Sequence, residues 1–419
     1  MRVSRSTIFI ALIAFGLMAE VGCGDQYRPV ANPVLSPGGQ PQSNHFAWVV
    51  NNNPQGDGST TEIDVSGDTN LAVNAMGKGT SAEAFPTNSL SLYVANAGDD
   101  TVMQYLPTLS GAITTISLLP GSHPIALNSS LNTSMYVLNS GTNSDCQNTG
   151  SISTITTATL SVSNTTCVGV DPIAMVQGPN GGYIYIINKG DNSLTVFNPA
   201  GPTVVTTLTE TNGLGPNPVA LAVTPQGWIC IVTQGDGTPA HPPTLNLILS
   251  GYDYIAANAP LGAQPNYAFV DPNRNRLYVT NGGDNTVSVF DSSSINPSGN
   301  PQIPLLGTAK VGTDPIGVTV LLDGSNFFTA NAGSNDVSVV SQNSFSLLTA
   351  VTLPTGAVPV FIASDPTSQR VYVADQGTFE TTIIQTSNNT ISGSIAAPTQ
   401  VFGCTSNCAL QTPLMIVTQ

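Results

Sequence analysis

The chain has 419 residues, a formal net charge of -15 and 8% charged residues, against about 25% in an ordinary globular domain. Its Lys and Arg total only 9, which disfavours binding to nucleic acid or anionic lipid, because both require basic groups that displace counterions. The plentiful Gly, Pro, Ser, Thr and Asn are typical of an exported, turn-rich, all-β protein.

Residues 1–22 predict an export signal. Arg2 and Arg5 precede an apolar run from Ile8 to Ala19, which is too short to span a bilayer comfortably and lies where a signal peptide has its hydrophobic segment. The following Glu20-Val21-Gly22-Cys23 resembles the bacterial lipobox in Gly22 and Cys23, whereas Glu20 stands where an apolar residue is usual. We expect Cys23 to be acylated as the first residue of the mature chain, with ordinary cleavage near Gly24 as the alternative.

Residues 23–45 predict a flexible tether, because they are rich in Pro, Gly, Gln and Asn and show no apolar period. Its random-coil reach is on the order of 25 Å, enough to hold a folded domain clear of a membrane. We therefore expect a cell-envelope lipoprotein of the outer membrane or cell surface, or a periplasmic or secreted protein if Cys23 is not lipidated.

Residues 46–419 repeat one hairpin element and predict a single domain. Its clearest copy is Leu277 to Phe290, LYVTNGGDNTVSVF. The β-branched and aromatic residues at both ends suit pleated strands, and Asn and Gly between them supply the positive-φ positions of a tight hairpin. Eight copies align on residues 43 to 50 positions apart: Trp48, Tyr93, Tyr136, Tyr185, Cys230, Tyr278, Phe328 and Tyr372. This period is typical of a four-stranded propeller blade.

Further strands surround these hairpins. Ahead of seven of them lies an apolar segment that Pro often opens, as in Pro172-Ile173-Ala174, which suits the crowded innermost strand of a blade. The weakest such segment is Asn70 to Val73, which we interpret as the inner strand of the Tyr93 module. A fourth strand follows the hairpin, as at Ala112 to Leu118.

These segments predict an all-β protein, a β-propeller of four-stranded antiparallel blades. Eight blades are favoured, and seven are the alternative if the divergent copy at Phe46 to Val65 packs irregularly. That copy has no good inner strand before it, whereas Thr412 to Val417 copies the Pro-led inner strand with no hairpin after it. We therefore expect the C-terminal strand to join the N-terminal blade and close the ring.

The Pro-led strand followed by LYVTNGGDNTVSVFD resembles the repeat of the YVTN-type β-propeller family, found in surface-layer and other envelope proteins of archaea and bacteria. The resemblance covers the chain from about Phe46 to its end, and family members usually have seven blades. It implies the propeller fold. The family's relation in fold to bacterial propeller lactonases implies, as an alternative function, a hydrolase whose catalysis rests on Asp, Asn or Arg around the central channel.

Residues typical of metal and haem sites are scarce. His45, His123 and His241 have no metal-ligand spacing and there is no CxxCH motif, so we expect no metal and no cofactor. Groups such as Gly283-Asp284-Asn285 lack the alternating oxygen ligands of a calcium loop, and we interpret them as turns. No Ser, His and acid set stands out, so catalytic residues stay unassigned.

The six Cys predict two disulfides, since export permits them. Cys146 lies in a hairpin loop and Cys167 follows the fourth strand of the same module, and these loops open on one face of a blade. We therefore pair Cys146 with Cys167. Cys404 pairs with Cys408 in the long loop before the last strand, and Cys230 is expected to be a buried free thiol.

The longest loops predict a recognition surface. The Cys230 module has a hairpin loop from Gln234 to Pro243 and a connection from Gly251 to Gln264, which we interpret as lying on one face. The candidate binding residues are Asp236, His241, Tyr252, Asp253 and Tyr254, because Tyr offers a large amphipathic contact area at low entropic cost. Alternatively, the two tyrosines cap the blade edge.

The sequence thus predicts an exported, lipid-anchored propeller that serves as a binding or scaffold module. Its partner would be a protein, glycan or small molecule of the envelope, with contact to the membrane only through the lipid anchor. A role without catalysis is favoured. A lactonase-like hydrolase and a structural surface-layer component are the alternatives.

Overall fold

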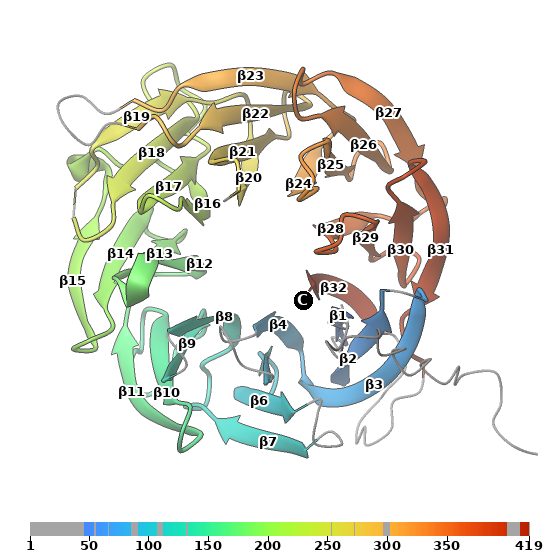
Figure 1. The fold of residues 1–419 in the computed structure, drawn as a ribbon. Helices are drawn as coiled ribbons and strands as arrows, with labels where there is room; N and C mark the ends of the chain where they lie inside the picture. The colour runs from blue at the N-terminus through green and yellow to red at the C-terminus, as the bar shows by residue number, and fades with distance from the viewer. Residues whose placement is uncertain are drawn as a thin grey trace, which may run out of the picture.

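The computed structural model describes residues 46–53, 56–65, 67–84, 91–106, 112–130, 133–252, 254–271, 273–295, 302–399 and 411–418. These residues form eight four-stranded antiparallel sheets arranged as the blades of one ring (Figure 1). The protein is an eight-bladed β-propeller, as the hairpin count predicts. Two short 3-10 turns, η2 (Pro179–Gly181) and η3 (Glu210–Asn212), lie in connections.

Each blade runs from an inner strand at the centre of the ring to an outer strand at its circumference (Figure 1). The inner strands are β32 (Thr412–Thr418), β4 (Thr80–Ala84), β8 (Pro124–Ser130), β12 (Pro172–Gln177), β16 (Pro218–Val223), β20 (Pro265–Asp271), β24 (Pro315–Val320) and β28 (Pro359–Ser364). The second strands are β1 (Phe46–Asn52), β5 (Leu92–Asn96), β9 (Ser134–Asn139), β13 (Ile184–Asn188), β17 (Trp228–Thr233), β21 (Arg276–Asn281), β25 (Asn326–Asn331) and β29 (Arg370–Asp375).

The two remaining strands of each blade complete the sheet towards the solvent. The third strands are β2 (Asp57–Asp64), β6 (Thr101–Leu106), β10 (Ser151–Thr156), β14 (Ser193–Asn198), β18 (Thr244–Leu249), β22 (Thr286–Asp291), β26 (Asp336–Ser341) and β30 (Glu380–Gln385). The outer strands are β3 (Thr69–Lys78), β7 (Ala112–Ser117), β11 (Ser161–Cys167), β15 (Thr203–Leu208), β19 (Ala257–Pro260), β23 (Leu305–Lys310), β27 (Leu347–Thr352) and β31 (Thr390–Ala396).

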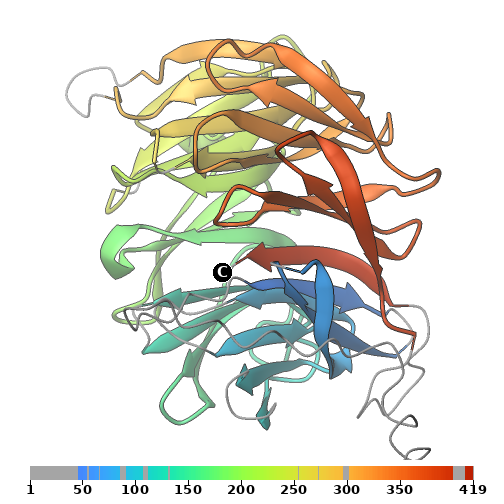
Figure 2. The same ribbon diagram turned by 45° about the vertical axis from the view of Figure 1, so that its right-hand side comes forward.

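The ring is closed by the C-terminal strand. β32 pairs with β1 in a register that sets Val49 opposite Ile416, and Figure 2 shows it lying beside the first strands of the chain. Gln411, just before β32, also donates from Nε2 to the Asp57 carbonyl at 2.7 Å. The first and last segments therefore complete one blade, as predicted, and no sheet edge is left open between them.

One inner strand differs from the prediction. Asn70 to Val73 belongs to β3, the outer strand of the first blade, because it pairs with β2. The inner strand of the Tyr93 blade is β4 instead, which follows after Gly79 alone, at φ +62°. The sequence of β4, TSAEA, has neither Pro nor a large apolar residue, so its pattern does not stand out.

The core lies in layers between neighbouring blades. Second strands such as β13 and β17 are buried at every residue, as expected for a sheet covered on both faces. Aromatic rings link adjacent blades across these layers: Tyr278 of β21 lies 5.2 Å from Phe327 of β25, measured between ring centroids. Such apolar layers make the ring one cooperative unit.

The strand order gives the ring two distinct faces. The turns between second and third strands emerge on one face together with the connections between blades, and we call this the hairpin face. The connections from first to second strands and from third to outer strands emerge on the other, which we call the opposite face. Neighbouring turns within a blade therefore alternate between the two faces.

The hairpin face is held by buried amides at the ends of the second strands. In the β13 blade, Nδ2 of Asn188 donates to Ser193 Oγ and Thr195 Oγ1, both at 2.9 Å, and its Oδ1 accepts from the Gly169 backbone at 3.1 Å. Six blades have Asn at this position: Asn51, Asn96, Asn139, Asn188, Asn281 and Asn331. In the β13 blade this Asn therefore ties the hairpin to the connection that leads into its own blade, and Asn96 Oδ1 similarly accepts from Gly77 at the end of the preceding outer strand.

The turn residues then link one blade to the next. In the Tyr278 hairpin, Asp284 Oδ2 accepts from the backbone of Ala263 at 2.6 Å, and Asn285 Oδ1 accepts from Asp314 of the following connection at 3.0 Å. Asn285 has φ +56°, whereas Gly283 lacks a positive φ, contrary to our expectation. A Cβ on Gly283 would lie 3.0 Å from the Cβ of Ala263, so a side chain there would press against the connection that enters the blade.

Candidate functional site

Two long segments of neighbouring blades meet on the hairpin face. The first is the connection from β15 to β16, where Thr209 and Asn212 form a capping box and Thr209 donates from its backbone to Asn212 Oδ1 at 3.0 Å. Gly213, at φ +87°, ends the η3 turn. This local structure places Glu210 on the surface with its side chain 66% exposed.

The second segment is the hairpin loop between β17 and β18, which Asp236 closes on itself. Asp236 Oδ1 accepts from the backbone and the hydroxyl of Thr238, at 2.9 and 2.6 Å. The Asp236 backbone donates to the His241 carbonyl at 3.3 Å. These contacts fix the position from which the His241 side chain leaves the loop.

His241 joins the two segments. Its Nδ1 lies 2.8 Å from Asp236 Oδ2 and its Nε2 lies 3.0 Å from Glu210 Oε1. Both ring nitrogens therefore face a carboxylate, and only the imidazolium, with two N–H groups, can donate to both. The geometry is that of a cation held between two anions at the junction of two blades.

The charges of this cluster reinforce one another. The hydrogen bond to Asp236 raises the pKa of His241, and the charges of Asp236 and Glu210 act in the same direction. The hydrogen bonds from Thr238 and His241 hold the pKa of Asp236 well below its usual range. Because the folded-state pKa of His241 is raised, the bridge is complete below the ordinary value of 6.5 and is lost as pH rises through the raised value.

A cavity of about 470 Å³ opens beside this bridge, a size typical of small-ligand sites. Its wall combines the apolar Leu214, Pro216 and Ala259 with the polar Asn246 and Asn258. Glu210 and His241 line it as well, so the cavity has a charged rim over a wall of mixed polar and apolar residues. Its lining residues come from the β15–β16 connection, the β17–β18 loop and strands β18 and β19.

The predicted recognition surface is divided by the structure. Asp236 and His241 lie on the hairpin face, but Tyr252 and Tyr254 lie between β18 and β19, on the opposite face. The prediction that both long loops share a face is wrong, because Gly251 to Gln264 contains the outer strand β19 and is not a simple link between blades. Asp253 lies outside the described residues.

Tyr252 and Tyr254 form an exposed pair on that opposite face. Their ring centroids lie 5.7 Å apart at an interplanar angle of 83°, and the side chains keep exposed fractions of 48% and 54%. The Tyr252 carbonyl accepts from the Tyr185 hydroxyl of the preceding blade at 3.3 Å. The loop is thus anchored to its neighbour while both rings stay in solvent.

The cysteines agree with prediction where the structure describes them. Cys146 and Cys167 form a disulfide. Cys230 is a buried free thiol, and burial raises its pKa to about 12. Cys23, Cys404 and Cys408 lie outside the described residues.

The inner strands hold few groups for acid–base chemistry. Glu83 of β4 and Asp271 of β20 are the only ionisable acids in their sequences, and none contains His, Lys or Arg. Asp271 is fully buried and accepts from Arg274 Nη1 at 3.2 Å. Of the Asp, Asn or Arg that the lactonase alternative requires around the channel, these strands supply the buried Asp271 together with Asn128 of β8 and Asn266 of β20.

The hairpin turns already use their carboxylates as structural acceptors. Asp99, Asp191 and Asp284 each accept from a backbone N–H of the connection that enters the same blade. In the part of the chain that the structure describes, no group of three or more His, Cys, Asp or Glu side chains could hold a metal ion. These turns thus have a structural task that needs no cation.

Glu210 is the site residue that the sequence reading misses. Its contact with His241 joins two connections that lie 31 positions apart, and no periodic pattern reports on such a contact. Two local signals point to it: the long interval between β15 and β16, and the sequence Thr209-Glu210-Thr211-Asn212-Gly213, which suits a capped turn.

Comparisons with known proteins find similarity only among solved structures, and this similarity concerns the fold. No protein-family model matches the chain, and no curated protein matches its sequence. Among solved structures, it is similar to the dihydro-heme d1 dehydrogenase NirN, with TM-score 0.66 and 13% identity over 94% of this chain and 79% of that one.

Two further propellers are similar over most of their length. Sqt1 of Chaetomium thermophilum, bound to the N-terminus of a ribosomal protein, matches with TM-score 0.60 and 13% identity over 79% of this chain and 91% of that one. A candidate 6-phosphogluconolactonase from Bacteroides fragilis matches with TM-score 0.54 and 15% identity over 91% and 100%. At such identities the likeness shows the β-propeller fold alone.

The structure also shows whether the described residues include a helix that could span a membrane. Among the residues it describes, helices are confined to short turns, and none has the length and hydropathy needed to cross a bilayer.

Proposed function

We propose that the chain is an exported, lipid-anchored envelope propeller that acts as a binding or scaffold module and takes its partner at the hairpin face. The single observation that carries this proposal is the cavity beside the Glu210–His241–Asp236 bridge. It has the volume of a ligand site and a charged rim over a mixed polar and apolar wall, and it lies where two blades meet.

Charge favours a partner with a cationic group at this face. Acidic side chains gather in the hairpin turns and in the connections between blades, as at Asp100, Asp191 and Asp314. Glu210 contributes one carboxylate to His241 and remains two-thirds exposed, so it can accept a further hydrogen bond. The likeness to Sqt1, which binds the N-terminus of a ribosomal protein, supports recognition of a chain segment by a propeller.

The bridge suits binding better than catalysis. Both nitrogens of His241 are occupied by carboxylates and its pKa is raised, so the ring lacks the free lone pair of a general base. The lactonase-like hydrolase remains the second candidate, favoured by the likeness to the candidate 6-phosphogluconolactonase. Lactone turnover by purified protein would favour it.

The test is chemical cross-linking of the full chain in its native envelope, followed by capture and identification of the bound partner. Glu210→Gln with Asp236→Asn should reduce specific capture about tenfold, since both remove charges that form the rim. Asp323→Asn, an exposed acid of the opposite face, is the matched control and should capture normally. Equal capture by all three proteins would overturn the proposal.

A further inference from the structure

Large exposed apolar side chains are distributed unequally over the two faces. Of the seven most exposed within the described residues, one is Val358 of the hairpin face at 48% and six lie on the opposite face or at the ends of outer strands that reach it: Tyr252, Tyr254, Leu305, Leu322, Leu347 and Leu348, with exposed fractions of 45% to 54%. On the hairpin face only Val170, Val358 and Phe379 are comparably exposed.

These side chains form an arc over consecutive blades. Tyr252 and Tyr254 precede β19, while Leu305 opens β23 and Leu347 opens β27. Figure 1 shows β19, β23 and β27 in succession along the outer edge of the ring. Leu306 and Leu348 adjoin them with exposed fractions of 43% and 54%. An apolar arc of this kind on a soluble domain marks an interaction surface.

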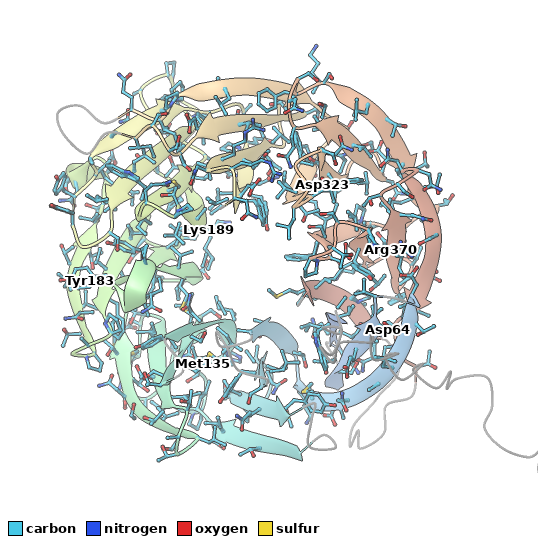
Figure 3. The ribbon with its side chains drawn as sticks, in the orientation of Figure 1. Asp64, Met135, Tyr183, Lys189, Asp323 and Arg370 are labelled. Atoms are coloured by element: carbon cyan, nitrogen blue, oxygen red, sulfur yellow. A yellow bond between two sulfur atoms is a disulfide. The ribbon has the colours of Figure 1, made fainter. Side chains whose placement is uncertain are left out.

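Ion pairs on the opposite face offset part of its negative charge, while acids such as Asp323 stay exposed. Arg370 Nε lies 2.9 Å from Asp68 Oδ2, and Figure 3 shows Arg370 beside the blade that carries Asp64. Arg276 stacks over the Phe345 ring at 5.5 Å and donates to a backbone carbonyl. Anionic headgroups would repel the acidic hairpin face more strongly than this one.

The chain also enters the propeller from this face. β1, a second strand, begins here at Phe46, so the preceding segment is joined to the ring on the side of the apolar arc. In the mature chain proposed above, that segment begins at Cys23. A lipid on Cys23 would therefore be joined to the propeller on its opposite face.

We propose that the opposite face rests on the membrane surface, with the Tyr252–Tyr254 pair and the leucines of β23 and β27 placed in the boundary between headgroups and acyl chains. Tyr suits this boundary because its ring is apolar and its hydroxyl polar. The occupant is a lipid surface, in addition to the predicted anchor. The hairpin face then points away from the membrane, where a partner can reach it.

The experiment places one fluorophore on each face of the full chain and reconstitutes the protein in phosphatidylcholine vesicles with brominated acyl chains. The labelled positions are Tyr254→Cys and Phe379→Cys, with exposed fractions of 54% and 43%, whereas Cys230 is buried and does not label. Bromine should quench the probe at 254 about threefold more than the probe at 379, since interfacial insertion reaches only the headgroup and upper acyl region.

A second comparison protects against an indirect effect of the label. Leu347→Ser with Leu348→Ser should halve the quenching at position 254, while Val358→Ser on the hairpin face should leave it unchanged. Equal quenching of the two probes, or quenching of neither, overturns the proposal. So does a signal at 254 that depends on protein concentration at fixed lipid, because that result points to contact between copies.

Discussion

The two faces of the ring use the same strands and differ in what holds their loops. On the hairpin face, side-chain amides and carboxylates accept or donate at almost every turn, as Asn188 does within its blade and Asn285 does between blades. On the opposite face, carboxylates close turns within single loops, as Asp291 does with Ser293 and Asp323 with Ser325, beside exposed leucine and tyrosine side chains. The Asn and Asp of the repeat motif thus make their contacts on the hairpin face. The loop sequences of the opposite face are free to vary because the motif does not include them.

The closing strand supports both faces, and its loss should have the largest effect. Deleting Pro413–Gln419 removes the ladder between β32 and β1 and exposes the buried Ile416. We expect the unfolding temperature to fall by more than about 10 °C, measured by circular dichroism. An unchanged transition would show that the two ends fold independently and would refute closure.

Removing one buried amide side chain of the hairpin face should lower the free energy of unfolding far more than removing an exposed amide side chain of the opposite face. Asn281 donates to Thr286 Oγ1 and Ser288 Oγ, both at 3.0 Å, and is fully buried. We expect Asn281→Ala to cost about 3 kcal/mol of unfolding free energy, because buried hydroxyls lose their partner. The control is Asn343→Ala, at an exposed position of the opposite face, which should change stability by less than about 0.5 kcal/mol. Equal costs would remove the contrast between the faces.

Asp375 is an imperfect copy of this amide, and repairing it should stabilise the protein. It occupies the Asn position in the β29 blade, accepts from Thr382 there, and burial raises its pKa to about 6 from 3.8. Asp375→Asn should therefore gain about 2 kcal/mol at pH 7, since it removes a desolvated charge. Chemical denaturation checks the value.

The same substitution has a defined pH signature. Because the pKa of Asp375 is raised in the folded state, its protonation contributes stability that is fully present below about pH 3.8. This contribution is lost as the pH rises to about 6. The advantage of Asp375→Asn over the native chain should hence grow between these values and stay constant above. Comparing the two chains cancels other groups, such as Glu62, whose pKa burial raises to about 7. A pH-independent difference would contradict this origin.

A smaller destabilising feature of the hairpin face is the backbone conformation of Val358, a β-branched residue at φ +52°. The corresponding connections have Asn217 or Asp314 at similar φ, which tolerate the left-handed conformation better. Val358→Asn should stabilise the protein by about 1 kcal/mol in thermal unfolding. Its backbone N–H keeps the bond to Asn335 Oδ1, so a loss of stability would show that the valine side chain matters for another reason.

The hairpin period predicts the number of blades and their closure, because it reflects the strand pairs that are buried on both faces. It fails at β4 and β19, whose sequences TSAEA and ANAP contain no aromatic residue and a single β-branched one, Thr80, and which form strands because neighbouring strands offer an edge. Because the sequence prediction does not include β19, it places Tyr252 and Tyr254 on the wrong face. The Glu210–His241 contact depends on loop conformation, which periodicity does not encode.

The most direct test of the account is cross-linked capture of the envelope partner by Tyr252→Ala with Tyr254→Ala, compared with Glu210→Gln with Asp236→Asn. If the hairpin face binds the partner and the opposite face rests on lipid, the tyrosine variant captures as the native chain does, and the acidic variant loses capture. Loss of capture by the tyrosine variant at an unchanged melting temperature, together with normal capture by the acidic variant, would contradict the division of the two faces.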